Sequence, residues 1–275
     1  WVDFDNSYKT MDASYTESVW WALKEIHKKG NLYEGRKVLM YCPHCETVLA
    51  KAEIAMDNTY KDVTEEAVFV KFRILNPEKL GLSQPTFMLA WTTTPWTLPG
   101  NVALAVGPEM EYVYVDVGDE VVIVAKERAA ALGLTAGKGV KGAELVGLQY
   151  DPLYPLEKVK AHTGKKWQVL PADFVTAEDG TGVVHTAVIY GEDDYQLGLR
   201  EGLPMVPILN ANATYNDDAP EFVRGQYIKK AEALIKSDPE TRGLLIKKEE
   251  HTHSYPHCYR CGTPLIYNAD SRWFI

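Results

Sequence analysis

Four cysteines carry the chemistry that is easiest to infer from this sequence. They are the only cysteines of the chain, and they stand in two C-x-x-C pairs, Cys42 with Cys45 and Cys258 with Cys261. This spacing lets two thiolates of one turn reach a single ion, and two such turns complete a tetrahedral zinc site. Because four cysteines leave no open coordination position, the ion would be structural rather than catalytic.

The two pairs lie far apart, with the whole of residues 46–257 between them. A zinc ion would therefore close a loop that contains a domain and would join its incoming and outgoing strands at the base. Gly262 eases the tight turn after the second pair, whereas Glu46 holds the matching place after the first and predicts a less regular turn. Two disulfides or four free thiols are alternatives. A nearby histidine could also replace one cysteine, the candidates being His44, His251, His253 and His257.

A run of threonines between two tryptophans is the second unusual feature, because residues 91–101 read WTTTPWTLPGN. The prolines at positions 95 and 99 count against a continuing central strand and predict a rigid loop. Such a loop would hold hydroxyl and amide groups in fixed positions, namely those of Thr92, Thr93, Thr94 and Asn101. The structural alternative is that threonines favour β structure and bond locally.

The third feature is a glycine-flanked strand, GTGVVHTA over residues 180–187, which delivers His185. The following GEDDY begins a helix with Asp193 and Asp194 in its first turn, where the helix dipole favours negative charge. The structural alternatives are a histidine satisfied within the core and aspartates that cap the helix. There is no nucleophile elbow, zinc-protease helix, phosphate loop or Cys–His pairing, so the motifs indicate no covalent nucleophile.

Strands and helices must position these residues. A helix is expected over residues 12–29, capped by Asp12 or by a capping box from Ser14 to Glu17 and ended by Gly30. Its buried face would consist of Val19, Leu23 and Ile26. A strand over 37–41 leads to the first cysteine pair. Further short strands, separated by glycine and proline turns, are expected over 67–74, 86–93, 102–106, 112–117 and 120–125.

Two more helices are expected, one from Asp193 to Gly202 and one over 222–236 that Asp238-Pro239 stops. A last strand over 244–248 runs toward the second cysteine pair. Many short strands with a few helices predict an α+β fold that is mainly β, with a barrel-like or sandwich-like core.

Composition bounds the class of protein. The chain has 275 residues, 46% hydrophobic and 24% charged, which is typical of one large or two smaller globular domains. The net charge of -9 argues against a broad basic surface for nucleic acid. No apolar stretch is long enough for a membrane span and no signal-peptide pattern opens the chain. We expect a soluble fragment of a longer protein, because the chain starts at Trp1 and ends within a structured-looking segment.

The motifs also resemble a known family. WTTTPWTLPGN, with GTGVVHTA and GEDD downstream, closely resembles the editing insertion of isoleucyl-tRNA synthetases. Residues 1–35 resemble the synthetase helix that precedes this insertion. YCPHCETVLAKAEI and HSYPHCYRCGTPLIYNADSRWFI resemble its two zinc-knuckle strands, so the resemblance covers nearly the whole chain. Leucyl and valyl enzymes typically carry Thr-Thr-Arg-Pro where this chain has three threonines before Pro95.

The resemblance implies a barrel-like editing domain over 61–244 on a base formed by residues 1–60 and 245–275, which holds the first helix and the zinc ribbon. It implies hydrolysis of valine wrongly esterified to tRNA(Ile), and no aminoacylation, because the HIGH and KMSKS motifs of the synthetic site are absent. The partners would be the tRNA(Ile) 3′ end that carries valine and the rest of the parent synthetase. A monomer in the cytoplasm is expected.

The same resemblance implies roles for individual residues. Asp194 would hold the α-ammonium of the misattached valine, and His185 would form the wall that excludes isoleucine. The ester, the terminal adenosine and the attacking water would be positioned by Thr92, Thr93, Thr94 and Asn101. Trp96 would shape the pocket or stack on the adenine. The remaining substrate-binding residues would be Thr97, Gly182 and Asp193. Residues 188–190 replace a proline-containing, Phe-ending run of the relatives, which affects the outline of the pocket.

Two other functions fit parts of the sequence. One is a free-standing trans-editing hydrolase, which needs a natural start and its own tRNA-binding surface. Trp1 and the net charge of -9 count against it. The other is a zinc-ribbon module that binds nucleic acid without catalysis.

Overall fold

The computed structural model describes residues 3–56 and 59–275, and the chain divides into two compact units. One unit takes in the chain up to Lys37 together with Ala269–Ile275, and the other is Val38–Asn268. These limits differ from the editing domain over 61–244 that the sequence predicts. The functional division into a base and an editing domain stays a prediction.

Helix α1 (Ala13–Lys28) belongs to the smaller unit and ends as predicted, because Gly30 takes a φ of 73° and donates its N–H to the His27 carbonyl. Asp12 is the N-cap residue, one of the two predicted positions, but its side chain makes no capping hydrogen bond and the predicted capping box from Ser14 to Glu17 does not form. The predicted buried face is wrong. No residue of α1 is buried, and Val19 is 41% exposed. Helical spacing creates an apolar stripe, but burial also needs a partner surface, which the rest of the smaller unit does not supply.

The strands of the described residues form three sheets. The first has the order β12-β1-β2, with β1 (Tyr33–Cys42), β2 (Thr47–Val48) and β12 (Ile266–Phe274). The second has the order β10-β5-β9, with β5 (Ala103–Val106), β9 (Val169–Pro171) and β10 (Val183–Thr186). The third has the order β11-β3-β4-β7-β6-β8. Its strands are β3 (Tyr60–Arg73), β4 (Thr86–Thr92), β6 (Glu111–Val117), β7 (Glu120–Ala125), β8 (Gly139–Lys141) and β11 (Leu245–Pro256).

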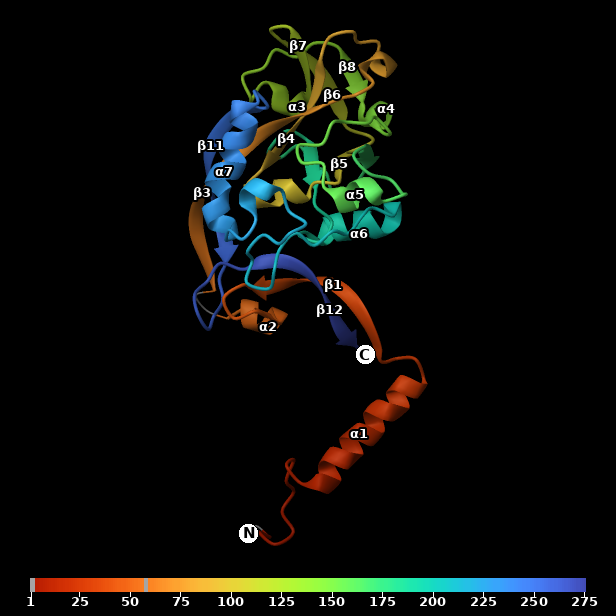
Figure 1. Cartoon of the computed structure of the whole chain (residues 1–275), viewed down its shortest axis with the longest axis vertical. Coiled ribbons are helices and arrows are strands. Elements are labelled where there is room, and N and C mark those ends of the chain that lie inside the picture. Colours follow the sequence, from red (N-terminus) through yellow and green to blue (C-terminus); the bar gives the residue numbers. More distant parts are fainter. Residues whose placement is uncertain (1–2, 57–58) are drawn as a thin grey trace. The chain divides into compact units, whose positions relative to one another are not determined.

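The predicted α+β, mainly β class is confirmed, although within the described residues none of the sheets closes into a barrel. Strands β3 and β11 are longer than predicted. They pair antiparallel from Tyr60 with Pro256 to Val70 with Leu245, and so form a two-stranded ribbon that reaches the cysteine turns (Figure 1). The sequence concealed this extension because residues 60–66 and 249–254 are largely polar and lack apolar alternation.

The longer helices lie where the sequence places them, with shifted ends. These are α6 (Glu192–Glu201) and α7 (Ile228–Thr241), and α7 packs against β11 (Figure 1). The predicted start of α7 at 222 and its stop at Asp238-Pro239 are wrong. Residues Glu221–Val223 form a separate 3₁₀ turn, η3, and Pro239 lies buried inside the last turn of α7. A proline so near the end removes only one backbone hydrogen bond, so the helix continues past it.

Shorter helical segments fill the connections. They are α2 (Lys51–Ile54), α3 (Lys126–Ala129), α4 (Gly142–Leu145), α5 (Glu157–Ala161), η1 (Pro77–Leu80) and η2 (Pro95–Gly100). Among the described residues, no helix combines the length and apolarity that crossing a membrane requires.

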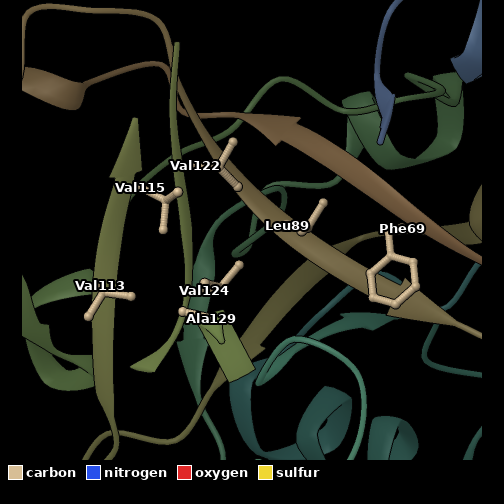
Figure 2. Packing of buried hydrophobic residues seen from close by; sticks show 7 residues of the cluster. All are labelled: Phe69, Leu89, Val113, Val115, Val122, Val124 and Ala129. Carbon is tan, nitrogen blue, oxygen red and sulfur yellow. The ribbon is translucent and has the colours of Figure 1, made fainter. Parts of the chain in front are cut away.

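The apolar core of the six-stranded sheet fixes the strand that carries the threonines. Figure 2 shows this cluster, whose members are Phe69, Leu89, Val113, Val115, Val122, Val124 and Ala129. Each full burial of such a side chain stabilises the fold by about 1.5–3 kcal/mol. Trp91 packs against the same cluster at the end of β4, so the backbone is anchored immediately before the threonine loop begins.

Candidate functional site

The threonine loop leaves β4 through the half-buried Thr93 and Thr94 and continues as the buried 3₁₀ segment η2. Pro95 stands at its start, which fits the rigid loop predicted from the two prolines. Thr92 Oγ1 accepts the Thr94 N–H at 3.0 Å and lies 3.2 Å from Thr94 Oγ1. The Thr97 hydroxyl donates to the Thr94 carbonyl at 2.8 Å. The hydroxyls of Thr92, Thr94 and Thr97 therefore belong to one local network. For Thr93, the described residues show no side-chain hydrogen bond.

Strand β10 delivers the histidine, pairing antiparallel with β5 so that His185 stands opposite Leu104. The strand starts after Gly182, which has a φ of 73°. A Cβ on Gly182 would lie 2.4 Å from the Cβ of Ala125, and the Gly182 carbonyl accepts the Tyr112 hydroxyl at 2.7 Å. Only glycine fits this turn, so Gly182 sets the position of the strand that carries His185.

A buried hydrogen bond joins the loop to the strand. Thr97 Oγ1 and His185 Nε2 are 2.8 Å apart and buried. Burial lowers the pKa of His185 to about 4, so its imidazole is neutral at neutral pH. The other ring nitrogen, Nδ1, is buried and has no hydrogen-bond partner among the described residues. One ring nitrogen of the buried His185 is therefore hydrogen-bonded and the other is not. The structural alternative was a core histidine with its hydrogen bonds complete.

The carboxylate of Asp194 turns back toward the same strand. Its Oδ2 accepts the Ala187 N–H at 3.0 Å, two residues after His185. The N-cap residue of α6 is Gly191 and no side chain caps the helix, so capping does not describe Asp194. Burial raises its pKa to about 6, the Ala187 N–H opposes that rise, and the charge of Asp193 adds to it. A cationic partner would favour the ionised form of this half-buried acid.

Asn101, the last residue of the threonine motif, is bonded to the protein itself. Its Oδ1 accepts the buried Tyr150 hydroxyl at 2.6 Å, and its Nδ2 donates to the Ala103 carbonyl at 2.9 Å. These bonds fix the end of the loop against β5, which begins at Ala103.

Trp96 is 3% exposed and packs edge-to-face on Tyr190 with ring centroids 5.4 Å apart. Its carbonyl accepts the Tyr215 hydroxyl at 2.6 Å. Sequence reasoning missed Tyr150 and Tyr215, which stand in no motif and reach the loop only through the fold. Tyr190 had a signal, because it ends the 188–190 run that departs from the relatives.

A cavity of about 190 Å³ lies beside this network. Its lining consists of Trp91, Thr176 and residues 178–184. The indole Nε1 of Trp91 is buried without a hydrogen-bond partner among the described residues. The cavity therefore borders both the residue before Thr92 and the segment before His185.

The structure thus brings together most of the predicted site residues. Hydrogen bonds link Thr92, Thr94, Thr97 and His185, and Asp194 is bonded to Ala187, directly after the strand that carries His185. Asp193, beside it on α6, is exposed.

The four cysteines form a second centre. Their sulfur atoms all lie within 4.8 Å of one another, with Cys42 Sγ 3.5 Å and Cys45 Sγ 3.6 Å from Cys261 Sγ. Zn–S bonds of about 2.3 Å in a tetrahedron put the sulfurs about 3.8 Å apart, so this cluster fits zinc. The described residues contain no disulfide, and the metal-competent group holds only the cysteines and no histidine.

The first cysteine turn is more regular than predicted. Glu46 takes a φ of 49°, the same left-handed region as Gly262 at 73° in the second turn. The turn therefore keeps its shape although it lacks glycine. The backbone of Glu46 is strained instead, since this region costs roughly 1–2 kcal/mol for a residue with a Cβ.

Known structures show which class of fold this is. The crystal structure of GlLeuRS-CP1 matches with a TM-score of 0.52 at 17% identity, covering 67% of this chain and 100% of that one. The editing domain of the P. knowlesi cytosolic leucyl-tRNA synthetase matches with a TM-score of 0.50 at 14% identity, covering 67% and 96%. The chain therefore has the fold of a synthetase editing domain, as the resemblance implied.

The family follows from the sequence comparisons. The model of the family "tRNA synthetases class I (I, L, M and V)" matches residues 1–275, and the chain belongs to this family. Isoleucine–tRNA ligases of Treponema denticola and Thermus thermophilus are 41% and 42% identical over 100% of this chain. The enzyme of Clostridium tetani is 43% identical over the same share. The chain spans 28%, 26% and 26% of these relatives, respectively.

Proposed function

We propose that this chain hydrolyses the ester between valine and tRNA(Ile), the reaction that corrects a mischarged isoleucine tRNA. The observation that carries the proposal is the bonded network from Thr92 to His185, with the Asp194 carboxylate held on the same strand. The family and the fold support it, since the relatives are isoleucine–tRNA ligases and the matched structures are editing domains.

Asp194 is the proposed anchor for the amino acid. The α-ammonium of an aminoacyl ester is a cation with three donors, and a carboxylate is its natural acceptor. Burial, with a smaller contribution from the charge of Asp193, raises the pKa of this acid, so its ionised form is poorly stabilised in the free chain. An incoming ammonium would relieve that cost, which gives the amino end of the substrate a defined place.

His185 is the proposed wall that separates valine from isoleucine. One methylene is worth only about 1–3 kcal/mol in binding, which limits how well a single site can separate valine from isoleucine. Enzymes of this family therefore use a second, hydrolytic site that excludes by size. A sieve that excludes by size needs a rigid wall. His185 is buried and neutral, and its ring is tied to Thr97. The burial of Trp96 likewise supports a pocket-shaping role rather than stacking.

The proposed hydrolysis uses water rather than a covalent nucleophile. A water oxygen adds to the ester carbonyl, the bond to the ribose oxygen breaks, and valine and a ribose hydroxyl are released. A histidine with a pKa of about 4 is a weak base at neutral pH, so rate would come from positioning and from hydrogen bonds to the oxyanion. The hydroxyls of Thr92, Thr93 and Thr94 are the proposed donors, and Asn101 holds their loop in place.

The cavity beside Trp91 is the proposed seat of the terminal adenosine. It is lined by Trp91, which directly precedes Thr92, and by residues 178–184, so it offers an aromatic side chain and backbone groups. Those features suit a flat heterocycle with nitrogen acceptors. The substrate would then be surrounded by Thr97, Gly182 and Asp193, which would line the site.

We also propose that the four cysteines hold a structural zinc ion, as the all-thiolate donor set and the sulfur spacing support. Zinc here would join the two ends of the β3–β11 ribbon at its base and would take no part in the reaction. The remaining proposals are that the chain acts as a monomer in the cytoplasm with the rest of the parent synthetase, and that it does not charge tRNA itself.

Soaking crystals of the chain in a non-hydrolysable valyl-adenosine analogue tests the site. The analogue is expected with its ammonium on Asp194, its side chain against His185 and its base in the Trp91 cavity. An analogue that occupies another part of the chain, or that fails to bind at millimolar concentration, would contradict the proposed function.

A further inference from the structure

One face of the six-stranded sheet changes from apolar to charged along β3. Phe69 belongs to the apolar cluster of Figure 2, and Lys71 and Arg73 follow it at every second position, so all three lie on the same face. Arg73 pairs with Phe87 of the neighbouring strand β4. A cavity of about 390 Å³ lies at this place, and Lys71, Arg73 and Phe87 line it. The charged end of the face therefore borders open space rather than packed side chains.

Two of the three cationic residues that line the cavity already have an acid as partner in the described structure. The Lys71 ammonium is bound to the carboxylate of Glu120, and it lies 4.6 Å from the centre of the Phe87 ring. Arg242 Nη1 donates to the carboxylate of Asp238 at 2.9 Å. The charges of Lys71 and Arg242 are therefore balanced within the protein.

Arg73 and Asp151 are not balanced in this way. Both are exposed and line the cavity, and neither side chain has a hydrogen bond or an ion pair within the described residues. Their backbones are adjacent, because the Asp151 N–H donates to the Arg73 carbonyl at 2.7 Å. Tyr150 stands opposite Ile74 and its ring contacts Phe72, so the alternation of side chains puts Asp151 on the face of Arg73. The cavity therefore offers one cation and one anion that are neighbours but do not pair.

A ligand that uses both groups must carry two opposite charges close together. A simple anion would meet Arg73 but also the carboxylate of Asp151, and a simple cation would meet the reverse. A zwitterion suits both, since a carboxylate can accept two hydrogen bonds from a guanidinium and an ammonium donates to a carboxylate. Pro85, Phe87 and Leu244 line the same cavity and give it an apolar wall. A free α-amino acid with an apolar side chain combines these features.

We propose that this cavity binds a free aliphatic amino acid, with its carboxylate on Arg73 and its ammonium on Asp151. The cavity lies at the start of β4, whereas the threonine loop follows the end of that strand, so this site is separate from the proposed reaction site. An amino acid esterified to tRNA has no free carboxylate, so the site would distinguish the released amino acid from the esterified one. The inference goes beyond the proposed function and does not depend on it.

Titration of the ¹⁵N-labelled chain with L-valine tests the site. The backbone signals of Phe87 and Gly243, which line the cavity, should shift saturably with valine concentration. Two analogues each remove one charge, because valinamide lacks the carboxylate and 3-methylbutanoate lacks the ammonium. Each analogue should bind at these signals about tenfold more weakly than valine, which is the cost of losing a hydrogen bond between charged groups.

Two substitutions test the same contacts from the side of the protein. Arg73→Gln and Asp151→Asn should each weaken valine binding about tenfold. Both residues are exposed, so the fold should persist. Arg224→Gln is the matched control, because Arg224 is an exposed arginine without an ion pair in the described part of the chain and does not line this cavity. Its affinity for valine should equal that of the unaltered chain.

The absence of a saturable shift at Phe87 and Gly243 with millimolar valine would overturn the proposal. Equal binding of either analogue would also overturn it, since one of the two charges would then be unused. Shifts confined to Ala187 would place valine beside Asp194 and contradict a separate site. None of these outcomes depends on ester hydrolysis, so a chain that fails to cleave Val-tRNA(Ile) would contradict the proposed function and leave this test intact.

Discussion

The cysteine cluster and the threonine–histidine network both join residues far apart in the sequence, but they differ in how completely their polar atoms are used. Four equivalent sulfurs within 4.8 Å form a closed ligand set with no position for a substrate. In the network, the side chains of Thr97 and Asn101 hydrogen-bond within the protein, whereas His185 Nδ1 has no partner among the described residues and the Asp194 acid is poorly compensated. A completed centre holds structure together, and an incomplete one can bind a ligand.

Removing zinc should have the largest effect, and it should fall on stability. Structural zinc is worth about 10–16 kcal/mol in isolated zinc-finger peptides. Chelation should therefore unfold the turns that carry the four cysteines and lower the midpoint of thermal unfolding substantially. Circular dichroism melts with and without a chelator, with metal content measured alongside, check this. Re-added zinc should restore the melt. An unchanged melt after proven metal loss would contradict a structural role.

Asp194→Asn should affect the other centre in the opposite way. Asn keeps an acceptor for the Ala187 N–H but loses the charge that would bind an ammonium, so valine release should fall about 100-fold. Because burial raises the pKa of the native acid to about 6, the charge opposes folding at pH 7. The variant should therefore be more stable, by on the order of 1–2 kcal/mol.

Urea unfolding and hydrolysis rates test both halves of this prediction. Glu192→Gln is the matched control, because Glu192 is an exposed acid in the same first turn of α6. It should change neither quantity much. A destabilised but active Asp194→Asn variant would make Asp194 a structural residue and remove the contrast between the two centres.

As the pH falls, substrate binding should weaken before His185, the proposed wall, becomes protonated. Asp194 must be ionised to hold the ammonium, so affinity for a valyl-adenosine analogue should be full above pH 7 and fall as pH drops through about 6. His185, with a pKa of about 4, stays neutral across this range. Titration calorimetry between pH 5 and pH 8 measures the change. A flat affinity profile would mean that another group carries the ammonium.

Glu46→Gly should have the smallest effect, and it tests whether the first cysteine turn is strained at residue 46. The native residue sits at a φ of 49°, a region that glycine adopts without strain. The substitution should stabilise the zinc-loaded chain by about 1 kcal/mol. A shift of the melting midpoint of a few degrees is expected, with no change in hydrolysis. A destabilised variant would show that the Glu46 side chain contributes more than its backbone costs.

The two centres were not equally predictable from sequence. The C-x-x-C spacing is local, so the pairs were evident, and only the conformation of Glu46 was misjudged. The threonine loop and His185 could be singled out, but their mutual contact depends on β4 and β10 meeting in space. Tyr150 and Tyr215 could not be found, because tyrosines outside any motif look alike until the fold brings them to the loop.

The fold shows the same limit. Largely apolar runs predicted β4, β6 and β7 closely, since consecutive residues of these strands are buried on both faces. The polar halves of β3 and β11 were missed because backbone pairing, not burial, holds them as strands. The exposed stripe of α1 was overinterpreted, because periodicity predicts a face and not its partner.

The most direct test is hydrolysis of Val-tRNA(Ile) beside Ile-tRNA(Ile) by this chain at micromolar concentration and low salt. The proposed site predicts release of valine with isoleucine left attached. Equal release of both would contradict the role of His185 as the excluding wall. If neither ester is cleaved, although the valyl-adenosine analogue binds at Asp194, the site would bind its substrate without hydrolysing it, and the proposed reaction would be wrong for this chain.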